Sequence, residues 1–305
     1  MRVKLHPSIR SWTLGVLIFS AMIAGCGESS QSDTDNSTGP GSKYLFIGHA
    51  YNRAAMDNTI DPRLTQIDFN QYDGIWWGGD VTVNPNLSQD QMAYLRTTAR
   101  MDHPNTLWAY GNHEYDPEAV KLASESLEKP IFDFWRDGQL GVFVFNSSLA
   151  KADCENKNDQ LNALRKAVKT ESGIDQFVFL SHHAIWCDIV PESEIRAVAN
   201  SVRPNQLLGC SVETTFSDVV QPLSHEMADR GVQVLCLAGD AGIRPQKNGA
   251  WKDDQGIEYV VCGIGDSKDH ARDSITYQND ELLVLHSTSQ LLSWELSPIV
   301  SLSEK

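Results

Sequence analysis

Five short apolar runs in this sequence end in glycine or serine, and each is followed at once by a polar side chain that can bind a metal ion. Short apolar runs that stop at a small residue are typical of buried β-strands. The polar residues that follow them are His49, Asp80, Asn112–His113, His182–His183 and Asp240. Open α/β sheets bind ligands at the carboxyl ends of their strands. The pattern therefore predicts an α/β fold that gathers these side chains into one site.

The residue types at these positions narrow the kind of metal. They offer imidazole nitrogens and carboxylate or amide oxygens, and none of them is a cysteine. That donor set suits borderline or hard ions such as Zn, Mn or Fe. The sequence therefore predicts a metal site where the strands end.

Helices are predicted between the earlier strands. Ser88 to Gln91 reads as a capping box, and Asp116 with Pro117 is a favourable helix start. A hairpin is predicted from residues 132–135 and 141–145. The late strands follow one another without helices and are therefore predicted to be antiparallel, at 258–262, 282–286 and 292–296. Strand–helix alternation with such additions predicts a layered α/β fold with two sheets.

The first forty residues predict export rather than fold. A basic segment at residues 1–10 precedes an apolar run at 13–24 that is short for a bilayer span. The run ends in Ile-Ala-Gly-Cys, which resembles a bacterial lipobox. We therefore predict a lipoprotein signal peptide at 1–25, a lipidated Cys26 opening a flexible linker at 26–43, and a folded domain at 44–305. The alternative is an ordinary signal peptide with a chance cysteine.

This N-terminal segment also predicts where the protein acts. A lipidated Cys26 would anchor the chain in the bacterial cell envelope, facing the periplasm or the exterior. The membrane would then be a partner through the lipid alone.

Charge and cysteine content exclude other classes. The 305 residues hold 40 acidic and 25 basic side chains, a net charge of −15, which argues against nucleic-acid binding. Six cysteines are too few for a disulfide-built scaffold. Cys236 and Cys262 are predicted to be buried thiols. The remaining loop cysteines allow one disulfide, with Cys187–Cys210 or Cys154–Cys187 the better pairings.

Three motifs occur together in a known order. They are Gly79-Asp80, Gly111-Asn112-His113-Glu114 and Ser181-His182-His183. In this order the chain resembles the calcineurin-like metallophosphoesterases over about residues 44–290. The resemblance implies a four-layer α/β/β/α sandwich of two mixed β-sheets, with the metal site at the carboxyl ends of the strands. It also implies hydrolysis of a phosphate mono- or diester, on a small molecule or a polymer, by metal-bound hydroxide.

The resemblance assigns roles to individual residues. Asp80 would bridge two metals, and a second metal would be held by Asn112, His182 and Asp240. His113 would contact the phosphate and protonate the leaving oxygen, with Glu114 holding its imidazole in the right tautomer. Glu114 could equally be a charge at the start of the next helix, and His183 could replace His182.

Two motifs depart from the family pattern. His49-Ala50-Tyr51 stands where the family has D-x-H, and Gly239-Asp240-Ala241-Gly242 stands where it has G-H-x-H. The first metal would therefore rely on His49, Asp80 and Tyr51. Nearby, Arg53 and Arg244 could clamp phosphate or be ordinary surface arginines.

These departures leave three outcomes open. The site could hold two metals with rearranged ligands, one firm metal, or none in a catalytically dead relic. One or two ions per chain, with Mn, Zn or Fe preferred, are expected from a working site. The alternative function is a non-catalytic surface lipoprotein that binds a phosphorylated or sugar ligand in the same cleft.

Overall fold

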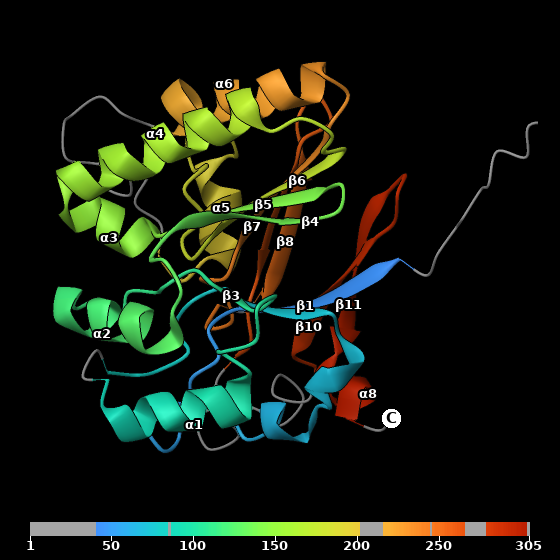
Figure 1. The fold of residues 1–305 in the computed structure, drawn as a ribbon. Helices are drawn as coiled ribbons and strands as arrows, with labels where there is room; N and C mark the ends of the chain where they lie inside the picture. The colour runs from blue at the N-terminus through green and yellow to red at the C-terminus, as the bar shows by residue number, and fades with distance from the viewer. Residues whose placement is uncertain (1–40, 85–86, 202–215, 245, 266–278, 304–305) are drawn as a thin grey trace, which may run out of the picture. The chain divides into compact units, whose positions relative to one another are not determined.

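Two β-sheets packed face to face form the centre of the computed structural model (Figure 1). The structure describes residues 41–84, 87–201, 216–244, 246–265 and 279–303. The predicted signal peptide, Cys26 and most of the predicted linker lie outside these residues. None of the helices within them is long and apolar enough to cross a membrane.

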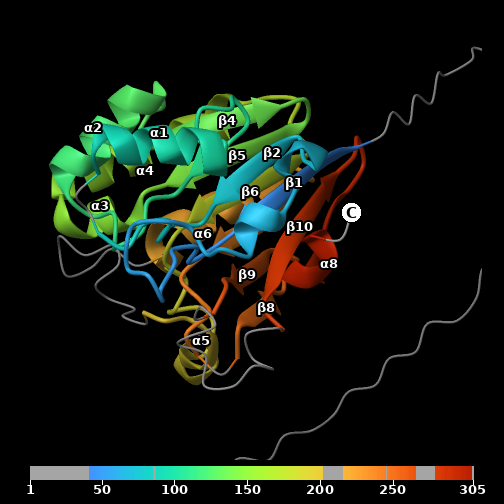
Figure 2. The ribbon, with the colours of Figure 1, turned by 90° about the horizontal axis from the view of Figure 1, so that it is seen from below.

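The first sheet has the strand order β11-β10-β1-β2-β3. Three of its strands are parallel: β1 (Ser42–Ile47), β2 (Gly74–Trp77) and β3 (Leu107–Trp108). β10 (Glu281–Ser287) and β11 (Leu292–Pro298) extend the sheet in antiparallel pairing. Figure 2 shows β2, β1 and β10 side by side. The two last predicted strands are therefore antiparallel, as expected.

The second sheet has the order β4-β5-β6-β7-β9-β8. Its parallel centre consists of β5 (Leu140–Phe145), β6 (Gln176–Ser181), β7 (Gln233–Ala238) and β9 (Glu258–Cys262). Its antiparallel edges are β4 (Asp133–Asp137), from the predicted hairpin, and β8 (Asn248–Lys252).

The prediction that strand 258–262 is antiparallel is only half right. β9 pairs antiparallel with β8 but parallel with β7. The sequence reading missed β8, which lies between β7 and β9 in the chain. The direction of β8 is opposite to that of β7 and β9. The chain therefore reverses twice between β7 and β9, which makes these two strands parallel without a connecting helix.

Helices cover the outer face of each sheet. The core outside the first sheet includes side chains of α1 (Gln89–Ala99), α2 (Pro117–Leu127) and α8 (Ile299–Ser303). The core outside the second includes side chains of α3 (Ser147–Ala152), α4 (Cys154–Thr170), α5 (Glu192–Val198) and α6 (Phe216–Asp229). The predicted four-layer α/β/β/α sandwich with two mixed sheets is confirmed (Figure 1).

The two predicted helix starts are also confirmed. The Ser88 side chain accepts a hydrogen bond from the amide of Gln91 at 3.2 Å, at the start of α1. The Asp116 carboxylate accepts from the first amides of α2, those of Glu118 and Ala119. Short polar side chains at these positions satisfy amides that have no partner within the helix.

The glycines at the strand ends let the two sheets meet backbone to backbone. A Cβ atom on Gly239, after β7, would overlap the carbonyl oxygen of Gly78, after β2. A Cβ atom on Gly48, after β1, would overlap the carbonyl oxygen of Gly239. The amide of Ile264 also donates to the carbonyl of Gly48 at 3.1 Å. The strand ends of both sheets therefore converge, and the polar residues that follow them are brought together.

Both predicted disulfide pairings are wrong. Each of them uses Cys187, which is a free, buried thiol that donates to the carbonyl of Ala184 at 2.9 Å. Cys187 belongs to the same buried core cluster as side chains of α5 and α6. Cys154 is the disulfide-bonded residue, and its partner lies outside the described residues. Cys236 and Cys262 are buried free thiols, as predicted.

Candidate metal centre

The loops after β1 and β2 run side by side and present His49 and Asp80. Both residues have left-handed backbone conformations, with φ of 55° and 52°. The amide of His49 donates to the carbonyl of Gly79 at 3.1 Å, and the amide of Tyr51 donates to the carbonyl of Asp80 at 2.9 Å. These two hydrogen bonds hold the loops in register, so the unusual turns are fixed by their neighbours.

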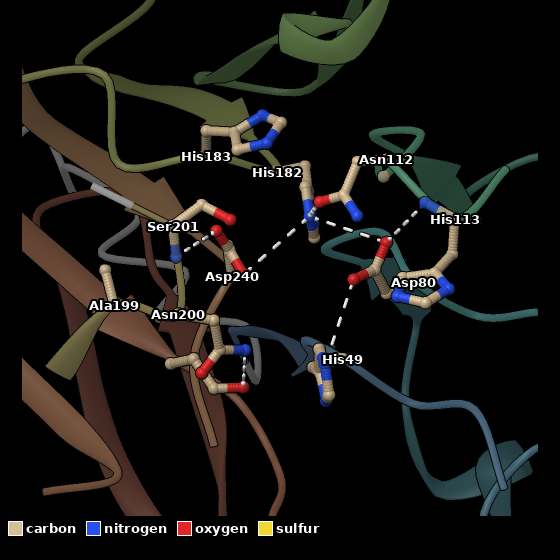
Figure 3. A network of polar contacts seen from close by, with 12 residues as sticks. His49, Asp80, Asn112, His113, His182, His183, Ala199, Asn200, Ser201 and Asp240 are labelled. Atoms are coloured by element: carbon tan, nitrogen blue, oxygen red, sulfur yellow. Dashed lines mark hydrogen bonds and ion pairs between the residues drawn. The ribbon is translucent and has the colours of Figure 1, made fainter. Parts of the chain in front are cut away.

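The carboxylate of Asp80 lies between two imidazoles (Figure 3). Its Oδ1 atom is 3.5 Å from Nε2 of His182, and its Oδ2 atom is 3.8 Å from Nε2 of His49. All three side chains are buried. Each oxygen thus faces a different imidazole, which is the arrangement that a bridging carboxylate needs.

His182 carries the clearest chemical signal in the centre. Its Nδ1 atom lies 2.7 Å from the carbonyl oxygen of Gly78, which can only accept, so the proton of a neutral ring is on Nδ1. Nε2 then points a lone pair at three oxygens: Asn112 Oδ1 at 3.2 Å, Asp80 Oδ1 at 3.5 Å and Asp240 Oδ1 at 4.0 Å. A lone pair facing three acceptors is favourable only if a proton or a metal ion lies between them.

These separations suit ligands that share one ion. Metal–ligand bonds of about 2.0–2.2 Å place neighbouring ligand atoms roughly 3–3.5 Å apart. The first two distances from Nε2 of His182 fall in that range, and the distance to Asp240 exceeds it slightly. We call His182, Asp80, Asn112 and Asp240 the His182 corner. Its residues fit a metal ion.

Asp240 is aimed at His182 by its backbone surroundings. Its amide donates to the carbonyl of His182 at 2.9 Å, and its Oδ2 atom accepts from the amide of Ser201 at 2.9 Å (Figure 3). The amide of Asn200 donates to the carbonyl of Asp240 at 2.9 Å. Since Oδ2 is engaged, Oδ1 is the atom that faces His182.

His183 lies beside this corner but faces elsewhere. Its Nδ1 atom is 2.8 Å from the hydroxyl of Ser147, and its amide donates to the same hydroxyl at 3.1 Å. Potential ligand atoms of His182, His183 and Asp240 nevertheless lie within 4.8 Å of one another. The predicted alternative of His183 as a ligand therefore stays open.

The pKa directions follow from burial and from the acidic neighbours. Burial opposes a charge on His182, but Asp80 and Asp240 outweigh it and raise its pKa. Burial raises the pKa of Asp240. Burial lowers the pKa of His49 to about 4, so His49 is neutral at pH 7 and its ring can donate a lone pair to a cation. The concentration of buried acids at the His182 corner favours a bound cation.

On the side of Asp80 that carries Oδ2, different residues gather; we call His49, Asp80 and Tyr51 the His49 corner. Among the described residues the structure brings His49, Asp80 Oδ2 and the Tyr51 ring together there. Tyr51 is buried, with its ring centroid 4.9 Å from that of His49 and 4.8 Å from that of His113. At Gly242, where the family pattern has its last histidine, a Cβ atom would overlap the carbonyl oxygen of Ile264. That position cannot carry a histidine side chain in this fold.

His113 and Glu114 lie in the loop after β3, next to Asp80. Nδ1 of His113 is 2.9 Å from the carbonyl oxygen of Val83, and its amide donates to Oδ1 of Asp80 at 3.1 Å. The carboxylate of Glu114 instead accepts hydrogen bonds from backbone amides of Asp80, Thr82 and Gly111. The predicted role of Glu114 in orienting His113 is therefore wrong: Val83 fixes that ring. The alternative, a charge at the helix start, stays a prediction; the first amides of α2 are bound by Asp116.

Arg244 is committed to the protein backbone. Its guanidinium donates to the carbonyls of Ala199 at 3.3 Å and Asn200 at 3.1 Å, in the segment that holds Asp240. Arg53 is half-buried, and its charge contributes to the lowered pKa of His49. Arg244 is exposed, and its backbone contacts favour the predicted alternative of a surface arginine over the phosphate clamp.

The sequence reading missed the partners that act through the main chain. Gly78 and Val83 fix histidine tautomers through carbonyl oxygens, and Ser201 orients Asp240 through its amide. Any residue type offers these groups, so no side-chain pattern could have identified them.

The fold and the centre together define a two-sheet α/β protein with a buried cluster of histidines and carboxylates at its strand ends. No family model matches the chain, and no curated protein matches it. Among solved structures, the chain is similar to Vps29 of Chaetomium thermophilum, over 84% of this chain and 95% of that one. The identity is 12% and the TM-score 0.30, so this likeness carries no argument about activity.

Proposed function

We propose that this protein is a metal-dependent phosphoesterase with one tightly bound ion at the His182 corner. The observation that carries the proposal is the convergence of Nε2 of His182 with three oxygens, while Nδ1 is committed to the carbonyl of Gly78. The ligands would be His182, Asp80, Asn112 and Asp240. Bound there, an ion such as Zn, Mn or Fe would activate water and neutralise phosphoryl charge.

The protein side chains would do the remaining work. His113 borders the Asp80 carboxylate and is half-buried, so it can reach both the centre and the solvent. With Nδ1 directed at Val83, Nε2 is the atom that can deliver a proton to the leaving oxygen. Neutral His49 and the Tyr51 ring, whose centroid lies 4.8 Å from that of His113, would border the phosphate beside His113.

The acidic character of the chain agrees with this proposal. A protein with a net charge of −15 repels phosphate esters at long range unless a cation meets them. We further propose that the predicted lipid on Cys26 anchors the domain at the bacterial cell envelope, where the substrate would be an exported or extracellular phosphate ester.

The test is hydrolysis by the full chain, purified in detergent. Aryl phosphate monoesters and diesters are supplied with Mn, Zn or Fe in turn, and turnover is expected with at least one metal. Asp80→Ala should abolish it, while His286→Ala, at a partly exposed histidine on β10, should retain it. Lack of turnover by the wild-type chain under every condition would exclude this activity.

The second candidate is a non-catalytic lipoprotein that binds a phosphorylated or sugar ligand. It is favoured by one observation, the position of Gly242, which removes a ligand from the His49 corner. This candidate predicts metal binding and phosphate binding without turnover. Calorimetric titration of inorganic phosphate into the metal-loaded chain, beside the hydrolysis assay, separates the two.

A further inference from the structure

The loops after β2 and β3 hold each other through two carboxylates. Asp80, from the first loop, accepts the amide of His113 at its Oδ1 atom, at 3.1 Å. Glu114, from the second loop, accepts the amide of Asp80 at 3.0 Å and that of Thr82 at 2.8 Å. The exchange is reciprocal, since each loop supplies the carboxylate that binds the amides of the other.

Both carboxylate oxygens of Glu114 accept hydrogen bonds in this contact. Oε2 accepts the amides of Asp80 and Gly111, at 3.0 and 2.7 Å, and Oε1 accepts the amide of Thr82. The side chain is fully buried. A buried carboxylate is costly unless such donors satisfy it, and hydrogen bonds from amides to a charged acceptor are stronger than neutral ones.

The hydrogen bonds of Glu114 are made to backbone amides at or next to the proposed metal ligands. Asp80 has the left-handed φ of 52°, which a non-glycine residue adopts only when its surroundings enforce it. Gly111 directly precedes Asn112, and a Cβ atom there would overlap Oδ1 of Asp80. Two of the three amides that Glu114 binds therefore belong to one proposed ligand, Asp80, and to the residue before another, Asn112, and the third is that of Thr82.

We propose that Glu114 is a positioning residue that joins the two ligand loops and holds Asp80 and Asn112 in the geometry that receives the ion. This inference rests on the proposed metal site. It replaces the expected role in orienting His113, and it makes metal affinity, rather than proton transfer, the property that depends on Glu114.

The test uses Co²⁺ alone as the probe, with the full chain in detergent. Glu114→Gln keeps the size of the side chain but turns an NH₂ group toward at least one backbone N–H. Co²⁺ affinity, measured by calorimetry, should fall at least about tenfold, as the loss of an outer partner of a ligand typically does. The visible absorption of bound Co²⁺ should also change, because the ligand geometry changes. Glu118→Gln, an exposed glutamate on α2, is the matched control and should leave both properties unchanged.

A merely structural role predicts a different result. The metal-free melting temperature would fall, but the folded variant would bind Co²⁺ with unchanged affinity and an unchanged spectrum, and that outcome overturns the inference. If Glu114→Gln does not fold, Glu114→Asp, which shortens the reach to the three amides, takes its place with the same expectation. A wild-type chain that binds no Co²⁺ would instead overturn the proposed function, and this inference with it.

Discussion

A side chain at Gly242 would overlap the carbonyl oxygen of Ile264, since its Cβ atom would lie well inside the 3.0 Å that real Cβ atoms keep. Gly242 also has φ of 110°, in the region that favours glycine. The family pattern has histidine at that position, and the backbone of this chain there favours glycine. Gly242 therefore offers no side-chain ligand, whereas the three oxygens of the His182 corner lie 3.2 to 4.0 Å from Nε2 of His182.

The first prediction concerns this glycine. Gly242→Ala should destabilise the chain by about 2–4 kcal/mol, because strain at positive φ and overlap with the backbone add together. Gly256→Ala is the control: Gly256 has φ of 86°, but the nearest atom to a Cβ there is the flexible end of Lys252 at 3.7 Å. It should cost only about 1–2 kcal/mol. Urea unfolding of both variants measures the difference, and equal losses would contradict the overlap.

The second prediction concerns metal content. His182→Ala and Asp240→Asn should each reduce metal retained through gel filtration by at least about tenfold, whereas His49→Ala should retain about one ion per chain. The reason is that the first two changes remove an imidazole and a negative charge from the His182 corner, and the third leaves that corner intact. Elemental analysis gives the count, with His286→Ala as the control. Two ions in the wild-type chain, one of them lost in His49→Ala, would show that both corners bind metal.

The third prediction concerns pH and His49. Because burial lowers its pKa from 6.5 to about 4, the unfolded chain binds a proton more readily than the folded one between these values. The metal-free protein should therefore lose stability as the pH falls from about 6.5 to 4, by about 3 kcal/mol from this group. His49→Gln should remove that part of the loss. The measurement is urea unfolding at pH 7 and pH 4.5 in the presence of a chelator, and an unchanged pH dependence in His49→Gln would contradict it.

The fourth prediction concerns His113. If it protonates the leaving oxygen, His113→Ala should lower turnover by about 10²–10⁴-fold. The metal content should stay within about twofold of wild type, because the contribution of His113 to the Asp80 ligand is its backbone amide, which alanine keeps. Parallel kinetics and elemental analysis check both. A loss of metal together with activity would place His113 among the supports of the ion instead.

Much of the fold could be predicted because local patterns decide it. The capping side chains of Ser88 and Asp116 act within a few residues, so α1 and α2 begin where expected. The direction of β9 could not be predicted, because it depends on a partner strand, β8, whose half-exposed sequence carries a weak hydrophobic signal. The same limit applies to Cys187, which lies near a loop in sequence but faces the core in space.

For the candidate site, the sequence alone determined which side chains stand at the strand ends, from His49 to Asp240. Apolar strands, the glycines that stop them and the polar residues that follow are all local features. The tertiary structure decided what each side chain does: Val83 rather than Glu114 fixes His113, Gly78 sets the tautomer of His182, and Glu114 joins two loops. The physical reason is that these partners are backbone amides and carbonyls, which every residue possesses and which only the packing of one sheet on the other brings within hydrogen-bond distance.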